Sequence, residues 1–165
     1  MATLKISDLS VGDWVGLEMA TLSIEGNDMA TAFVKKAQLP ARIKSILGDQ
    51  DLILVEVYAE DNFGVRYLKM EYIHPIPITA EILEQNGWEF SRDNLWWTTQ
   101  IAPYTRANVW LGNNGECRVE VSCMTKELDY YFCYADVKLP NAHIHLLQRV
   151  LRLAGVEKEI NLQEL

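Results

Sequence analysis

The segment Ile76–Trp88 constrains the fold of this chain more than any other, because it specifies both ends of a short helix. The hydroxyl of Thr79 is placed to cap the first turn. Gly87 fits the left-handed position after a helix, and Trp88 can pack back on the last turn. The pattern predicts a helix over residues 80–86 that is too short to be stable alone. This helix must therefore bury its apolar side against a sheet.

Before this segment, the chain has the pattern of short strands joined by tight turns. Gly12 and Asp13 predict a turn that leads into a strand with Trp14 and Val15. Further strands are predicted over residues 41–47, 52–58 and 65–73, and residues 23–38 are expected to form a long loop or ribbon. The order of short strands resembles a small SH3-like barrel. We therefore expect an SH3-like β-barrel module over residues 1–75.

After the segment, the pattern indicates an antiparallel sheet and a final helix. Strands are predicted over residues 95–99, 107–111, 117–123 and 130–139. The alternation places all three cysteines on inward faces, namely Cys117, Cys123 and Cys133. The final helix is predicted from the N-cap Asn141 to Gly155, with an apolar side that includes Leu146 and Leu153. The fold class is α+β, with a second module over residues 76–165 that is either separate or shares one core with the first.

Charge and composition exclude several classes of function. The formal net charge is −8, and neither half of the chain is basic, which disfavours nucleic acid as a partner. The apolar runs are too short to span a membrane. Met1 to Lys5 lacks the apolar core of a signal peptide, so a cytoplasmic location is expected. Three cysteines without close spacing agree with a reducing compartment.

The residues that commonly carry catalysis or metals form no recognisable motif. His143 and His145 are expected to point in different directions, and His74 is remote in sequence. No cysteine has an adjacent base, so the cysteines are expected to be core residues. We therefore expect no metal, no cofactor and no enzyme activity.

Aromatic side chains are dense in the second half of the chain. The candidate binding surface comprises Trp96, Trp97, Trp110, Tyr130, Phe132 and Tyr134. An open sheet face would make them a platform for a small molecule or a carbohydrate. A cover formed by the barrel or by a second subunit would make them core, and this alternative is favoured because large exposed apolar patches are rare. A basic helix face, formed by His145, Arg149 and Arg152, is either solvated or contacts an acidic partner.

The order of these features resembles a family of small proteins from gut bacteria and their prophages. The resemblance rests on the opening around Gly12, the segment from Ile76 to Leu83, the pair Gly87-Trp88 and the helix with His145-Leu146-Leu147-Gln148. The family has no assigned activity, so the resemblance carries no catalytic residue to this chain. The leading hypothesis is a non-enzymatic interaction or accessory protein, with protein partners or self-association. The alternative is a small-molecule or carbohydrate-binding module that uses the aromatic face.

Overall fold

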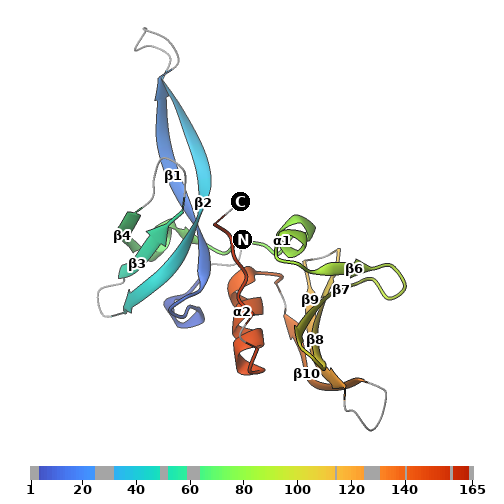
Figure 1. The fold of residues 1–165 in the computed structure, drawn as a ribbon. Coiled ribbons are helices and arrows are strands. Elements are labelled where there is room, and N and C mark those ends of the chain that lie inside the picture. Colours follow the sequence, from blue (N-terminus) through green and yellow to red (C-terminus); the bar gives the residue numbers. More distant parts are fainter. Residues whose placement is uncertain are drawn as a thin grey trace. The chain divides into compact units, whose positions relative to one another are not determined.

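The chain has a mixed α+β architecture of two compact units, each drawn in Figure 1. The computed structural model describes residues 4–24, 32–48, 52–58, 64–113, 115–124, 131–139, 141–156 and 158–163. The first unit is built from Met1–Ile76 and the second from Pro77–Glu164. Each unit contains one five-stranded antiparallel sheet. Within the described ranges, neither helix reaches the length and apolarity that crossing a bilayer requires.

The first sheet has the strand order β4-β3-β2-β1-β5. Its strands are β1 (Trp14–Ile24), β2 (Ala32–Leu47), β3 (Leu52–Val57), β4 (Gly64–Lys69) and β5 (Ile73–His74). The segment predicted as one strand over residues 65–73 is divided by a 3-10 turn, η3 (Met70–Tyr72). This turn carries the chain from one edge of the sheet to the other, where β5 pairs with β1. A second 3-10 turn, η1 (Ile6–Asp8), precedes β1.

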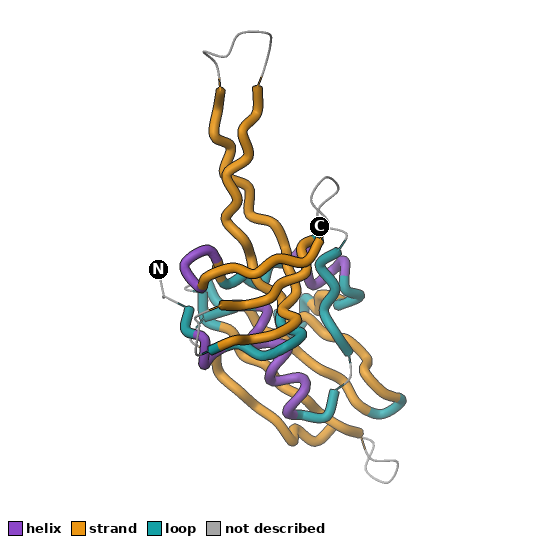
Figure 2. The backbone as a smooth tube through the Cα atoms, turned by 90° about the vertical axis from the view of Figure 1, so that its left-hand side faces the viewer, coloured by secondary structure: helices purple, strands orange, loops and turns teal. Residues whose placement is uncertain are grey.

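The segment predicted as a loop or ribbon contributes to a long ribbon. β1 and β2 pair in one register from Trp14↔Arg42 to Ile24↔Ala32. Residues 25–31 of the predicted segment lie outside the described residues. Figure 2 shows both strands continuing past the rest of the sheet.

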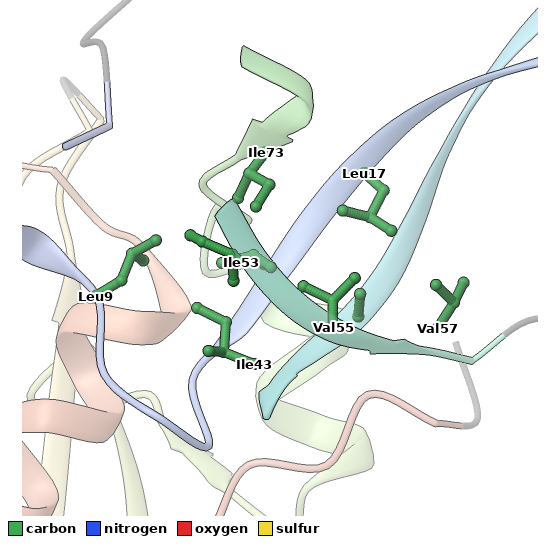
Figure 3. Close-up of a cluster of buried hydrophobic side chains, with 9 residues drawn as sticks. Leu9, Leu17, Ile43, Ile53, Val55, Val57 and Ile73 are labelled. Carbon is green, nitrogen blue, oxygen red and sulfur yellow. The ribbon is translucent and has the colours of Figure 1, made fainter. Parts of the chain in front are cut away.

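The core of the first unit follows the strand alternation (Figure 3). Ile53, Val55 and Val57 are fully buried at alternate positions of β3, as a strand with one inward face requires. The buried members of this core cluster are Leu9, Val15, Leu17, Ala41, Ile43, Ile53, Val55, Val57 and Ile73. The predicted turn before β1 is present, with Gly12 at φ +89°. The carboxylate of Asp13 closes it by accepting a 2.8 Å hydrogen bond from the backbone of Ser10.

The second sheet is a meander with the order β10-β9-β8-β7-β6. Its strands are β6 (Glu89–Ser91), β7 (Trp96–Ala102), β8 (Thr105–Leu111), β9 (Cys117–Met124) and β10 (Tyr131–Leu139). Helix α1 (Ala80–Gln85) precedes the sheet and helix α2 (Ile144–Leu153) follows it. The buried core of this unit includes Val109, Val119 and Val121 from the sheet and Leu147 and Leu151 from α2.

The capping predicted for α1 is confirmed. Thr79 Oγ1 accepts the backbone N–H of Ile82 at 3.3 Å. Gly87 has φ +72°, and the N–H of Trp88 donates to the carbonyl of Leu83 at 3.0 Å. This six-to-one bond is the mark of a Schellman ending. As the sequence predicts, α2 ends in the same way, with φ +71° at Gly155 and a 2.9 Å bond from Val156 to Leu151.

The start of α2 differs from the prediction. The N-cap position is held by His143 and not by Asn141, so the predicted cap is wrong. The backbone of His143 is extended and forms an isolated antiparallel bridge with Pro77. Helix α2 begins directly after this bridge, at Ile144.

The covered side of α2 is rotated from the predicted apolar side. Its buried residues are Ile144, His145, Leu147, Gln148, Val150 and Leu151. Leu153, predicted to face inward, is 82% exposed, whereas His145, predicted on the polar face, is 2% exposed. The rings of His143 and His145 stack with centroids 5.7 Å apart. The bridged backbone of His143 places its ring beside the first turn, and this arrangement corrects the prediction that the two side chains diverge.

The last described segment, residues 158–163, runs beside α1 without forming a strand. The side chain of Asn86 donates to the carbonyl of Asn161 at 3.0 Å and accepts the N–H of Asn161 at 2.6 Å. Ile160 and Leu162 are buried. The spacing of Ile160 and Leu162 in the sequence favours a short terminal strand, but residues 158–163 form none. The two hydrogen bonds of Asn161 come from the side chain of Asn86 and not from a neighbouring strand.

β10 contains a β-bulge that the alternation could not predict. Cys133 pairs with Ser122 and Ala135 pairs with Val121, so Tyr134 is the extra residue. A single extra residue puts the side chains before it out of phase with those after it, so Cys133 lies on the face of Ser122 and not on the face of Val121. Cys133 is consequently exposed, Cys123 is half-buried and Cys117 is buried. The prediction of three inward cysteines holds for Cys117 and is wrong for Cys133.

Candidate ligand-binding site

The outer face of the second sheet, which points away from the buried valines, carries a row of aromatic and basic side chains. Trp110 pairs with Arg118, and Arg118 pairs with Lys138, across β8, β9 and β10. Trp97 pairs with Val109, so Trp96 lies on the same face as Trp110. The register of this sheet therefore brings two indoles and two cations together from four strands.

These side chains line a hollow of about 660 Å³. The full lining, which we call the outer hollow, comprises Asn94, Trp96, Trp110, Glu116, Cys117, Arg118, Lys138 and Leu139. Its volume lies within the range of about 300–1,000 Å³ that is common for small-molecule sites. Trp96 and Trp110 are both half-buried, so each indole has solvent-accessible surface in addition to its packed surface.

Arg118 is held in one orientation by two contacts. Its Nε donates to Asp136 Oδ1 at 2.7 Å and its Nη2 donates to Asp136 Oδ2 at 2.5 Å. Its guanidinium also lies 5.7 Å from the centroid of the Trp96 ring, within reach of a cation–π interaction. The hydrogen bonds from Arg118 lower the pKa of Asp136 below its usual range, and Asp136 in turn raises the pKa of Arg118. Both groups are thus charged at neutral pH and largely cancel each other.

A polar row lies next to the outer hollow on the same face. Thr98 Oγ1 donates to Asn108 Oδ1 at 3.0 Å, and Asn108 Nδ2 donates to Glu120 Oε1 at 3.2 Å. Asn108 is only 6% exposed, and its two bonds satisfy the buried amide. The row keeps this part of the sheet face polar and ordered.

The hairpin between β6 and β7 places a strained residue beside the indoles. Leu95 has φ +61° and is the one non-glycine residue with positive φ in the described chain. A leucine in this conformation costs about 1–2 kcal/mol, and its side chain is also 59% exposed. Asn94 Oδ1 accepts the N–H of Trp96 at 3.3 Å, which ties the loop to the start of β7. Strain of this kind is concentrated at functional sites.

Leu95 borders a second hollow of about 300 Å³. Its lining comprises Phe90, Leu95, Trp97, Trp110, Leu111 and Asn113. Phe90 and Trp97 pair across β6 and β7, with ring centroids 5.1 Å apart. Trp110 borders both hollows, so the strained loop and the outer hollow belong to one end of the sheet.

The six aromatic residues predicted as one surface are divided by the structure. Trp96 and Trp110 line the outer hollow, whereas Trp97 is 7% exposed on the opposite face. Phe132 pairs with Cys123, on the face of the buried valines, and is 38% exposed, while Tyr134 at the bulge is 52% exposed. Tyr130 lies outside the described residues. The bulge therefore removes the aromatic end of β10 from the face that carries Trp96 and Trp110.

The predicted basic helix face is also divided. His145 is buried, and Arg149 and Arg152 are exposed. Arg152 borders a hollow of about 370 Å³ together with Gln148, Gly155, Val156, Lys158 and Glu159. Basic side chains at this end of α2 match the negative end of the helix dipole. The three residues thus do not form a single exposed surface.

Sequence reasoning missed most of the polar side chains of the outer hollow. Asn94, Arg118 and Lys138 are distant in sequence and meet only because the strand register brings them to one face. The outward position of Arg118 was readable from the alternation of β9. Its hydrogen bonds to Asp136 were not, because they depend on the register between β9 and β10, which no local pattern specifies.

Cys117 and His143 are of the side-chain types that often act in catalysis, but burial shifts the pKa of each. Burial raises the pKa of the Cys117 thiol to about 12, so its thiolate is scarce at neutral pH. Burial also lowers the pKa of His143. Within the described ranges, no three His, Cys, Asp or Glu side chains are grouped so as to hold a metal ion.

Comparison with known proteins yields no match to a protein family, a curated protein or a solved structure. The fold and the site define an α+β chain of two units with an aromatic and polar hollow on one sheet face.

Proposed function

We propose that this chain is a non-enzymatic binding protein whose outer hollow holds a small polar ligand. The observation that carries the proposal is the pair of half-buried indoles, Trp96 and Trp110, beside a guanidinium fixed by Asp136. Binding sites for small molecules combine aromatic surface with a few oriented polar groups in this way. Because the polar groups are held before a ligand arrives, less conformational entropy is lost on binding.

The electrostatics of the hollow support recognition in preference to proton transfer. A general acid or base works best with a pKa near the operating pH. The pKa of Asp136 is instead shifted down by Arg118, away from neutrality. A carboxylate that stays ionised orients Arg118 and accepts hydrogen bonds.

We further propose that the first unit is an SH3-like module that acts as the accessory part of the protein. Its strand order β4-β3-β2-β1-β5 and the 3-10 turn η3 between β4 and β5 support this assignment. The pairing of β5 with β1 supports it too, because this pairing joins the end of the module to its beginning.

A second candidate function is contact with a protein partner or a second copy of the chain. It is favoured by the exposure of Phe132 and Tyr134 at the edge strand β10. Exposed aromatic groups at an edge strand are typical of protein contacts. Solution mass measured for the wild type and for Phe132→Glu tests contact with a second copy: a dimer that dissociates on substitution supports it, and a monomer or an unaffected dimer contradicts it.

The ligand-binding proposal is tested by nuclear magnetic resonance of the tryptophan indole N–H groups during a screen of polar small-molecule fragments. We expect fragments to shift the signals of Trp96 and Trp110, assigned through Trp96→Phe and Trp110→Phe. Trp14, which is 2% exposed in the first unit, supplies a control signal that should not move. A screen in which no fragment shifts either indole contradicts the proposal.

A further inference from the structure

We infer that the ligand of the outer hollow is a neutral saccharide, an inference that rests on the proposed function. A sugar ring has apolar C–H faces and a polar rim of hydroxyl groups. The hollow offers both kinds of surface at once, since Trp96 and Trp110 supply aromatic faces while Asn94, Glu116 and Lys138 supply polar groups. An indole is a large, rigid surface on which such a ring can stack.

The charges of the hollow argue against an anionic ligand. The Nε and Nη2 atoms of Arg118 both donate to Asp136, so the carboxylate already occupies one of the two edges by which the guanidinium could bind a phosphate or carboxylate, and it offsets the charge of Arg118. The remaining cation of the lining, Lys138, is accompanied by the carboxylate of Glu116. The two cations, Arg118 and Lys138, are therefore balanced by two carboxylates, Asp136 and Glu116.

The polar row beside the outer hollow, formed by Thr98, Asn108 and Glu120, also disfavours an anionic ligand. Asn108 pairs with Glu120, and Glu120 pairs with Asp136, so two carboxylates follow the polar row across β9 and β10. Like charges near a bound anion would oppose it. Carboxylate oxygens in turn accept hydrogen bonds from hydroxyl groups, which a neutral sugar carries around its whole rim.

The size and position of the hollow agree with a mono- or disaccharide. Its volume of about 660 Å³ exceeds what one ordered water or ion needs. The loop residue Asn94 uses its side-chain oxygen to hold Trp96, and it also lines the hollow.

The experiment compares neutral and anionic sugars on the full-length chain. Cellobiose, maltose and diacetylchitobiose are titrated, with glucuronic acid and glucose 6-phosphate as anionic counterparts, while the indole signals and the heat of binding are recorded. We expect at least one neutral disaccharide to bind and to shift Trp96 and Trp110. Trp110→Ala and Trp96→Ala should each weaken this binding by about tenfold or more. Tyr134→Ala, a matched loss of an exposed aromatic ring outside the lining, should leave it unchanged.

A charge variant makes the test independent of the tryptophan variants. Asp136→Asn is nearly isosteric and releases Arg118 from its carboxylate. We expect it to increase the affinity for glucose 6-phosphate relative to the neutral sugar, because the balance of charge then becomes positive. Its circular dichroism spectrum and melting temperature confirm that the variant is folded.

The outcomes separate this inference from the function on which it rests. Preferential binding of glucose 6-phosphate by the wild-type chain overturns the neutral ligand but retains a ligand-binding hollow. Fragments that shift Trp96 and Trp110 without binding of any sugar also overturn the inference alone. If neither sugars nor fragments shift these indoles, both the inference and the proposed function are wrong.

Discussion

Gly87 illustrates how much of this fold is determined by single residues. Its φ of +72° is strained for any residue with a Cβ atom, and a Cβ built there would meet only Lys158 Nζ, at 3.7 Å. The cost of Gly87→Ala should therefore come from the backbone and amount to about 1 kcal/mol. Thermal or urea unfolding measures it. Gly64→Ala is the matched control, because Gly64 lacks a positive φ and a Cβ there has open space; equal effects of the two substitutions would contradict the capping assignment.

His143 gives a pH-dependent prediction at the same scale. Burial lowers its pKa in the folded state, so the unfolded chain binds more protons as the pH falls below the ordinary value of about 6.5. The stability contribution is thus intact above that pH and decreases as the pH falls towards the folded-state pKa. We expect the melting temperature of the wild type to fall as the pH is lowered over this interval, and that of His143→Gln to fall less.

The matching measurement for His143 is a proton titration followed by nuclear magnetic resonance, in which His143→Gln assigns the signal. A His143 pKa at or above that of free histidine would refute the prediction.

At the scale of secondary-structure elements, the β-bulge in β10 has a chemical consequence. It turns Cys133 to the exposed side, while Cys123 is half-buried and Cys117 is buried. We expect a maleimide to label Cys133 first, Cys123 more slowly and Cys117 last in the folded protein. Mass spectrometry of the digested protein gives the order, and labelling in denaturant should be complete at all three sites. A folded-state Cys133 as protected as Cys117 would show that the strand has no bulge.

The sequence predicts elements well where the signals are local. Both ends of α1 follow from Thr79 and Gly87, and the outward position of Arg118 follows from simple alternation in β9. It fails where a distant contact decides. The bridge between Pro77 and His143 sets the start of α2, and the bulge at Tyr134 sets the faces of β10. No local pattern specifies either feature.

The candidate site shows the same division. The type and density of Trp96 and Trp110 made them candidates for a binding surface in the sequence. The polar half of the outer hollow was not, because Asn94, Arg118 and Lys138 come from a loop and two strands whose register is set by the whole sheet. Phe132, which looks equivalent to the tryptophans in sequence, lies on the other face.

At the scale of the whole molecule, the buried core cluster of the first unit is built, among the described residues, from positions between Leu9 and Ile73. A unit with its own core is expected to fold by itself. We predict that a fragment of residues 1–76 gives the circular dichroism spectrum of a β-sheet protein and unfolds cooperatively. A fragment of residues 77–165 should keep dispersed indole signals for its tryptophans. An unfolded spectrum from either fragment would mean that the two units depend on each other.

The ribbon of β1 and β2 has a consequence for how the amide protons of one strand exchange with solvent. β5 joins β1 only at Gly16 and Leu17, and β3 joins β2 from Ala41 onward. Among the described residues, no third strand flanks the ribbon from residue 18 to residue 24. The backbone hydrogen bonds of these residues can break when β1 and β2 alone separate. Those of Val15 to Leu17 lie in a sheet over a buried core. Deuterium uptake should accordingly be fast in the outer half of β1 and slow in its inner half, so that one continuous strand has two opening free energies.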